Sequence, residues 1–256
     1  MTDRENLIAL YAQSSKHSNY QILSDKLTNL VGNDIEVRTR YEKERLRFIL
    51  DNVAVEGKNI VDIGGNSGYF SFELIEAGAK KLFYYEGNQS HADFVKLAAK
   101  VLEVENKIEV FDRYFSFNSE LHSQNIDIIL LLNVLHHVGD DYGSAELSLP
   151  KAKEEILKQL NSLADKTGIL VFQLGFNWQG NRNVCLFENG TKQELIDFVK
   201  TGIESSWEIQ SIGIAEKNNL TVEYQPLNEQ NIQRQDQLGE FLNRPLFILK
   251  SKKLKP

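Results

Sequence analysis

The segment from Asn59 to Phe70 constrains the fold more than any other part of the chain. It reads Asn-Ile-Val-Asp-Ile-Gly-Gly-Asn-Ser-Gly-Tyr-Phe, an apolar stretch interrupted by Asp62 and followed by a glycine-rich turn. The spacing Asp62-x-Gly64-x-x-x-Gly68 lets backbone pass close to a ligand where a side chain would collide. Open α/β sheets bind nucleotides at such a turn, between a first parallel strand and a helix. The alternative is a purely structural turn.

A second acidic residue supports the ligand-binding interpretation. Residues 81–86, Lys-Leu-Phe-Tyr-Tyr-Glu, predict an aromatic-rich strand that ends at Glu86. An acid about 20 residues beyond the glycines is suited to accept hydrogen bonds from ribose hydroxyls. The alternative is a solvated glutamate at a strand end. A third predicted strand, residues 107–111, ends at Asp112, although aspartate also starts turns for local reasons.

A fourth predicted strand is followed directly by polar residues. Residues 126–132 form an apolar run interrupted only by Asp127, typical of a central parallel strand that is buried on both faces. Ligands bind outside the carboxyl ends of such strands, so Asn133, His136 and His137 are expected at the site. One histidine would act as base or orient the substrate; the alternative is packing or capping. We favour His137, because a helical turn would bring it to the same face as Asn133.

These segments resemble motifs I and IV of the class I S-adenosylmethionine-dependent methyltransferases. The resemblance covers residues 36–256 and is specific in the first half. It implies S-adenosyl-L-methionine as cofactor, with the turn around its amino-acid end, the second-strand acid on its ribose and the third-strand acid at its adenine amine. The cofactor-binding residues that it implies are Asp62, Gly64, Gly65, Asn66, Gly68, Glu86, Asp112 and Asn133.

The remaining pattern predicts the fold class. Helices are expected over residues 150–165 and after the capping box Thr191-Lys-Gln-Glu194, and strands over 168–174, 207–214 and 245–250. Such alternation predicts an α/β protein with a parallel, doubly wound sheet. The resemblance implies a Rossmann-like, seven-stranded sheet of order 3-2-1-4-5-7-6 with the last strand antiparallel.

The same pattern predicts the domain organisation. We expect a single methyltransferase domain over residues 1–256, in which residues 1–50 form an N-terminal helical cap that helps to bind the substrate. Residues 51–256 would form the cofactor-binding core. Residues 218–244, rich in Asn and Gln, are expected to form a β-hairpin or a flap.

Two regions outside the core are candidates for acceptor binding. A helix expected over residues 35–52 would align Arg38, Tyr41 and Arg45 on one face. Arginine binds phosphate and carboxylate bidentately, so this face is a candidate anion-binding wall; the alternative is a solvated face with Glu–Arg pairs.

The second region is the segment 176–183, after the predicted fifth strand. It combines Trp178 and Arg182 with several amide side chains, which suits a sugar or another hydroxylated ligand. The alternative is a simple Asn- and Gly-rich turn.

Composition argues against several classes of function. The net charge of −7 argues against broad electrostatic capture of nucleic acid. No apolar run reaches the ~20 residues of a membrane span, and the N-terminus does not resemble a signal peptide. Cys185 is the only cysteine, which favours a reducing cytoplasm, and no motif resembles a zinc site. We therefore expect a cytoplasmic protein without membrane insertion and without a bound metal; a homodimer stays open.

The function expected from these features is S-adenosylmethionine-dependent O-methylation of a small molecule. The predicted arginine face and the amide-rich segment favour a phosphorylated, sugar-like or nucleotide-linked acceptor. The chain is also similar, less specifically, to methyltransferases that modify bacterial surface polysaccharides, which implies a role in polysaccharide biosynthesis. The alternatives are an RNA methyltransferase and a non-catalytic subunit that binds S-adenosylmethionine.

Overall fold

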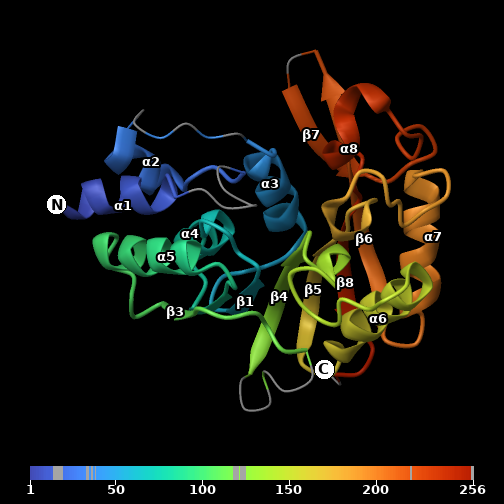
Figure 1. The fold of residues 1–256 in the computed structure, drawn as a ribbon, viewed down its shortest axis with the longest axis horizontal. Helices are drawn as coiled ribbons and strands as arrows, with labels where there is room; N and C mark the ends of the chain where they lie inside the picture. Colours follow the sequence, from blue (N-terminus) through green and yellow to red (C-terminus); the bar gives the residue numbers. More distant parts are fainter. Residues whose placement is uncertain are drawn as a thin grey trace. The chain divides into compact units, whose positions relative to one another are not determined.

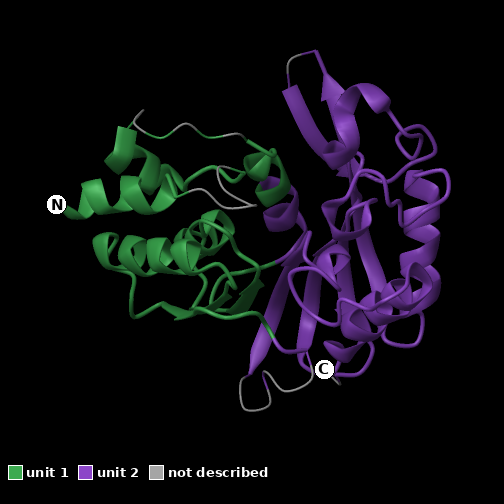
Figure 2. Ribbon diagram, viewed as in Figure 1, with its two compact units in different colours: residues 1–46, 54–115 green, residues 47–53, 116–256 purple. Residues whose placement is uncertain are grey.

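A computed structural model describes residues 1–13, 20–32, 35, 37, 39–117, 121, 125–219 and 221–254 (Figure 1). The chain divides into two compact units, one of residues 1–46 and 54–115 and the other of residues 47–53 and 116–256 (Figure 2). Most of the expected N-terminal cap therefore groups with the first three strands. In the described part of the chain, no helix combines the length and apolar character needed to span a bilayer.

The first unit contains three parallel strands, the helices that connect them and the helices that precede them in sequence. In β1, Ile63 lies opposite Tyr85 of β2, and Tyr85 lies opposite Phe111 of β3. The three strands thus end in register, and Gly64, Glu86 and Asp112 each follow the end of one strand. The elements are α1 (Asp3–Tyr11), α2 (Asp25–Val31), the start of α3 (Glu42–Asn52), β1 (Asn59–Ile63), α4 (Tyr69–Glu76), β2 (Lys81–Tyr85), α5 (Gln89–Val101) and β3 (Ile108–Phe111).

The second unit contains five strands of mixed direction. β4 and β5 are parallel, β8 is antiparallel to both β5 and β6, and β6 pairs with β7 as an antiparallel hairpin. The elements are β4 (Ile126–Leu132), η2 (Leu135–His137), α6 (Leu149–Ser162), β5 (Thr167–Gln173), η3 (Trp178–Gly180), α7 (Lys192–Ile203), β6 (Trp207–Asn218), β7 (Thr221–Pro226), η4 (Asp236–Leu238), α8 (Gly239–Leu242) and β8 (Leu246–Ser251).

The strand order is β3-β2-β1-β4-β5-β8-β6-β7, so the predicted Rossmann-like α/β sheet is confirmed. The last strand is antiparallel, as expected, but the predicted number of seven strands is wrong because β7 adds an eighth. β7 alternates exposed and buried residues, and the ring of its Tyr224 lies 6.3 Å from that of Phe48. This alternation is the period of a half-buried strand, a signal that the sequence already carries.

The helix predicted over residues 35–52 begins only at Glu42, in α3. The Glu42 carboxylate accepts hydrogen bonds from the Arg40 N–H (2.9 Å) and the Thr39 hydroxyl (3.0 Å), and Tyr41 has a left-handed backbone, with φ of 59°. These bonds stabilise a turn in place of a helix. The predicted common helical face is therefore not formed, and Arg38 lies outside the described residues. As a capping box, the spacing Thr-x-x-Glu of residues 39–42 would start a helix at residue 40, two residues before α3 begins.

Candidate functional site

The glycine-rich turn after β1 is folded tightly against β2. The Gly64 N–H donates to the Tyr85 carbonyl (2.8 Å), and Gly64 has a φ of +70°, which favours glycine. A Cβ atom at Gly65 would lie 2.4 Å from the Tyr84 ring, so a side chain there would collide with the strand. Gly68 directly precedes α4. The predicted backbone turn is present. The backbone conformation at Gly64 and the lack of space at Gly65 explain why glycine occupies these two positions.

Glu86 holds this turn in place from the end of β2. Its carboxylate accepts hydrogen bonds from the backbone N–H groups of Asn66 (2.9 Å) and Asn88 (2.8 Å). The Tyr84 hydroxyl also donates to the Asn66 carbonyl. These two backbone donors fix the orientation of the Glu86 carboxylate at the end of β2. The geometry gives Glu86 a structural role and leaves its predicted ribose contact a prediction.

Asp62 is buried beneath the same turn. Its Oδ2 accepts a hydrogen bond from the Ser71 hydroxyl (2.7 Å). Burial raises the pKa of Asp62 to about 7, the hydrogen bond from Ser71 opposes that rise, and the charge of Glu86 adds to it. Asp62 therefore connects β1 to the first turn of α4 from inside the unit.

Asp112 is exposed at the end of β3. It pairs with the Lys96 ammonium (2.8 Å) and accepts from Gln89 (3.4 Å). The hydrogen bond from Lys96 is the main reason that the pKa of Asp112 is lowered. Its predicted adenine contact stays a prediction.

Gln21 is a contact of the turn that the sequence did not single out. Its side-chain oxygen accepts hydrogen bonds from the Ser67 hydroxyl and the Tyr69 N–H, both 3.0 Å, at the start of α4. The Tyr11 hydroxyl donates to the Gln21 carbonyl (2.9 Å) and thereby anchors this segment to α1. No local pattern identifies Gln21, because its partners lie far along the chain.

Asn133, at the end of β4, is the centre of a buried polar network in the second unit. Its backbone is left-handed, with φ of 63°. Its side-chain oxygen accepts from Arg244 Nη1 (2.8 Å), and its amide donates to Gln173 Oε1 (2.9 Å). The Gln173 amide in turn donates to the Arg244 carbonyl (3.0 Å). Gln173 and Arg244 are buried, so the Asn133 side chain is fixed from two directions.

The arginine of this network is itself held by an acid. Arg244 Nε donates to Glu240 Oε1 (2.9 Å), and its Nη2 pairs with the other carboxylate oxygen. Glu240 Oε1 also accepts from the Phe176 N–H (3.0 Å), just after β5. The pair is therefore bidentate and connects α8 to the segments after β4 and β5.

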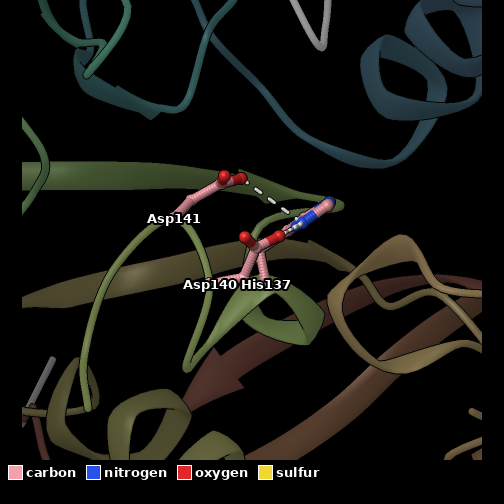
Figure 3. Close-up of side chains that lie close together, drawn as sticks. All are labelled: His137, Asp140 and Asp141. Carbon is pink, nitrogen blue, oxygen red and sulfur yellow. Dashed lines mark ion pairs between the residues drawn. The ribbon is translucent and has the colours of Figure 1, made fainter. Parts of the chain in front are cut away.

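The two adjacent histidines have different surroundings. His136 is buried, and its Nδ1 accepts a hydrogen bond from the Gly175 N–H (3.3 Å), which fits the packing alternative. His137 lies beside two carboxylates: its Nδ1 is 3.3 Å from Asp141 Oδ2 and 3.8 Å from Asp140 Oδ2 (Figure 3). These two carboxylates are additional to the residues expected from the sequence, although their i+3 and i+4 spacing after His137 is a sequence signal.

The structure also locates the predicted acceptor residues. The Trp178 indole N–H donates to the Val138 carbonyl (2.7 Å), so η3 packs on the segment after η2, and Arg182 is exposed. Tyr41 directly precedes α3. Arg45 is buried with its guanidinium 3.5 Å from Glu42 and 5.0 Å from the Phe70 ring centroid, so it does not lie on an exposed face. The acceptor roles of these residues stay predictions.

Comparisons with known proteins agree with this architecture. No family model matches the chain. It is 27% identical over 166 residues to a tRNA U34 carboxymethyltransferase of Helicobacter hepaticus, across 60% of this chain and 46% of that protein. The bifunctional kinase–methyltransferase WbdD is 16% identical with a TM-score of 0.56, across 95% of this chain and 46% of WbdD. EvdMO1 is 10% identical with a TM-score of 0.52, across 97% of this chain and 46% of its own.

The chain shares the fold of the kinase–methyltransferase WbdD. The resemblance expected from its motifs is thereby confirmed at the level of the fold. The chain spans about half the length of each of these relatives.

The buried carboxyl of Asp62 predicts a pH-dependent stability. Between about pH 4 and pH 7 the folded protein retains a proton on Asp62 that the unfolded chain releases, so stability falls as pH rises through this window. Asp62→Asn removes this dependence. The free energy of unfolding of Asp62→Asn minus that of wild type should increase by on the order of 2 kcal/mol between pH 5 and pH 8. Urea denaturation at the two pH values measures this difference. A relative stability that stays constant with pH, as expected for the exposed Asp51→Asn control, would contradict this.

The Arg244–Glu240 pair predicts non-additive effects on stability. Arg244→Leu removes a buried cation and leaves the Glu240 carboxylate partly buried, so the free energy of unfolding should fall by about 2 kcal/mol. In the double variant with Glu240→Leu the loss should be smaller than the sum of the two single losses, by about 1 kcal/mol or more. Thermal and urea unfolding measure this cycle, and strictly additive losses would mean that the two groups do not interact.

Proposed function

We propose that the protein is an S-adenosylmethionine-dependent methyltransferase. The observation that carries the proposal is the turn from Gly64 to Gly68, held by Glu86 at the in-register ends of β1 and β2. This is the position at which open α/β sheets bind nucleotide-like ligands. The shared fold with WbdD and the partial sequence identity to a tRNA carboxymethyltransferase support the proposal.

The described residues of the first unit fit this cofactor. Gly64 and Gly65 carry no side chain that would obstruct the amino-acid end of the cofactor, and the Glu86 carboxylate is the type of acceptor that ribose hydroxyls require. Asp62 lies beneath the turn, Asn66 and Gly68 belong to the turn, and Asp112 is the proposed contact of the adenine amine. When bound, S-adenosylmethionine supplies an electrophilic methyl group, so the protein has to align an acceptor and exclude water.

The proposed acceptor is a small molecule with a hydroxyl group, phosphorylated, sugar-like or nucleotide-linked. A hydroxyl of high pKa needs a base, and His137 is the proposed base. The fixed side chain of Asn133 is the proposed polar contact at the end of β4. Trp178 and Arg182 supply an aromatic surface and a cation in the segment after β5, and a role in bacterial surface polysaccharide biosynthesis is part of this proposal.

A second candidate acceptor is tRNA. The observation in its favour is the partial identity to a protein named as a tRNA U34 carboxymethyltransferase. The net charge of −7 weakens broad electrostatic binding of RNA, yet it does not exclude a local contact surface. Nucleic acid is therefore retained as an alternative to the small-molecule acceptor.

The two acceptor classes are separated by one labelling experiment. The protein is incubated with methyl-labelled S-adenosylmethionine and either a total tRNA pool or the small-molecule fraction of a cell extract. Label in the small-molecule fraction supports the first candidate, and nuclease-sensitive label in tRNA supports the second. Cofactor binding by calorimetry without transfer to either pool would support a non-catalytic subunit.

Glu86→Ala should weaken cofactor binding. It removes the proposed acceptor of the ribose hydroxyls and releases the Asn66 N–H from its partner, so the dissociation constant for S-adenosylmethionine should rise at least tenfold, about 1.4 kcal/mol. Calorimetry measures this value. The exposed strand residue Glu109→Ala is the matched control and should bind normally. Equal affinity of the Glu86 variant and wild type would argue against the proposed cofactor site.

His137→Asn should separate catalysis from cofactor binding. An amide keeps a hydrogen-bonding group but cannot take a proton, so turnover should fall by roughly 10²–10⁴-fold with cofactor affinity unchanged. The turnover of wild type should also decline on acidification, because a protonated imidazole cannot act as base. Near-normal turnover of the variant, with a flat pH profile in wild type, would mean that no base operates at this position.

A further inference from the structure

We propose that Asp141, assisted by Asp140, is a positioning residue that holds His137 in the tautomer required of a base. In this arrangement Nδ1 carries the proton and faces the carboxylates, and Nε2 is left as the proton acceptor. The inference deepens the proposed function, since it rests on His137 as the base. It assigns a role to two acids that belong to no sequence motif considered above.

The geometry distinguishes the two nitrogens of the ring. Both close contacts to a carboxylate involve Nδ1, at 3.3 Å from Asp141 and 3.8 Å from Asp140 (Figure 3). The His137 side chain is 13% exposed, against 22% for Asp141 and 35% for Asp140. The imidazole is thus the most buried of the three groups, and an interaction with a neighbouring charge is screened less by solvent there.

The local chain explains why the three groups meet. His137 ends the short helix η2, and the N–H groups of Asp140 and Asp141 donate to its carbonyl at 3.1 Å and 3.2 Å. The chain therefore turns back over the histidine and returns both carboxylates to the side of Nδ1. The Gly139 N–H donates to the Tyr142 carbonyl (2.7 Å), and Gly139 has a φ of +89°, which favours glycine in this turn.

Titratable groups of the described residues lie close to the His137 ring. On its own segment they are Asp140, Asp141 and His136, whose ring centroid is 4.3 Å from that of His137. The helix η3, which packs on this segment, contributes Trp178, Gln179 and Gly180, none of which titrates. The two carboxylates place negative charge beside Nδ1 of the ring.

The chemistry follows from this placement. A negatively charged carboxylate close to Nδ1 favours a proton on that nitrogen, and therefore the tautomer protonated at Nδ1. When the O–H bond of an acceptor breaks, its proton joins Nε2 and the oxygen keeps the electron pair. The resulting imidazolium is stabilised by the adjacent carboxylates, and the proton then passes from Nε2 to solvent.

Nitrogen-15 NMR of the histidine rings tests the proposal on the free protein, without any acceptor. The chain has five histidines, and the signal lost in His137→Asn identifies His137. In wild type the neutral ring should carry its proton on Nδ1. In Asp141→Asn the midpoint of its titration should move to lower pH by about 1 unit, because the imidazolium loses an opposite charge. Asp140→Asn should give a smaller shift, since its carboxylate is farther away.

Two further variants control this measurement. Asp141→Glu keeps the charge and should keep the midpoint close to that of wild type. Asp165→Asn also removes one carboxylate, from an exposed residue that pairs with Lys166, and should leave the His137 signal unchanged. A wild-type ring protonated on Nε2, or a midpoint in Asp141→Asn equal to that of wild type, would overturn the proposal.

The same three side chains are of the types that bind a divalent cation, so the experiment includes a test for metal binding. One ligand atom from each of His137, Asp140 and Asp141 lies within 4.8 Å of the others. If micromolar Mn²⁺ selectively broadens the His137 signal and EDTA abolishes turnover, the cluster is a metal site and the proposal is overturned. If the NMR results are as expected but His137→Asn retains turnover, the pairing stands and the base role in the proposed function fails.

Discussion

The parallel, in-register pairing of β1, β2 and β3 is the constraint on which the first unit depends. Because Ile63, Tyr85 and Phe111 lie side by side, the residues that follow them come together at one edge. Glu86 can then reach back to the Asn66 N–H and hold the glycine-rich turn. Without this register the turn would lose its main support from β2, and the proposed cofactor contacts would not converge.

The second unit fixes its proposed contact residue by a different means. Asn133 has a left-handed backbone. Its side chain is held by Gln173, the last residue of β5, and by Arg244, which lies just before β8. A buried cation is acceptable there because Glu240 pairs with it bidentately. The network orders a polar side chain directly after the apolar second half of β4, as a binding site requires.

The N-terminal segment is expected from the sequence to bind the acceptor. Its described contacts instead stabilise the first unit itself. Gln21 accepts hydrogen bonds at the start of α4, and Tyr11 anchors it to α1. Arg45, expected on an exposed face, is buried with Glu42. The segment therefore supports the proposed cofactor turn directly, and its contribution to acceptor binding stays a prediction.

The sequence by itself determined the features that depend on neighbours along the chain. The glycine-rich turn, the apolar strand β4 and the capping box at Thr191 follow from local backbone and burial preferences, and the structure contains all three. Only the tertiary structure decided the contacts of Gln21 and of Arg244, whose partners lie 46 and 111 residues away. Such contacts leave no periodic signal, because they form only when packing brings distant segments within hydrogen-bond distance.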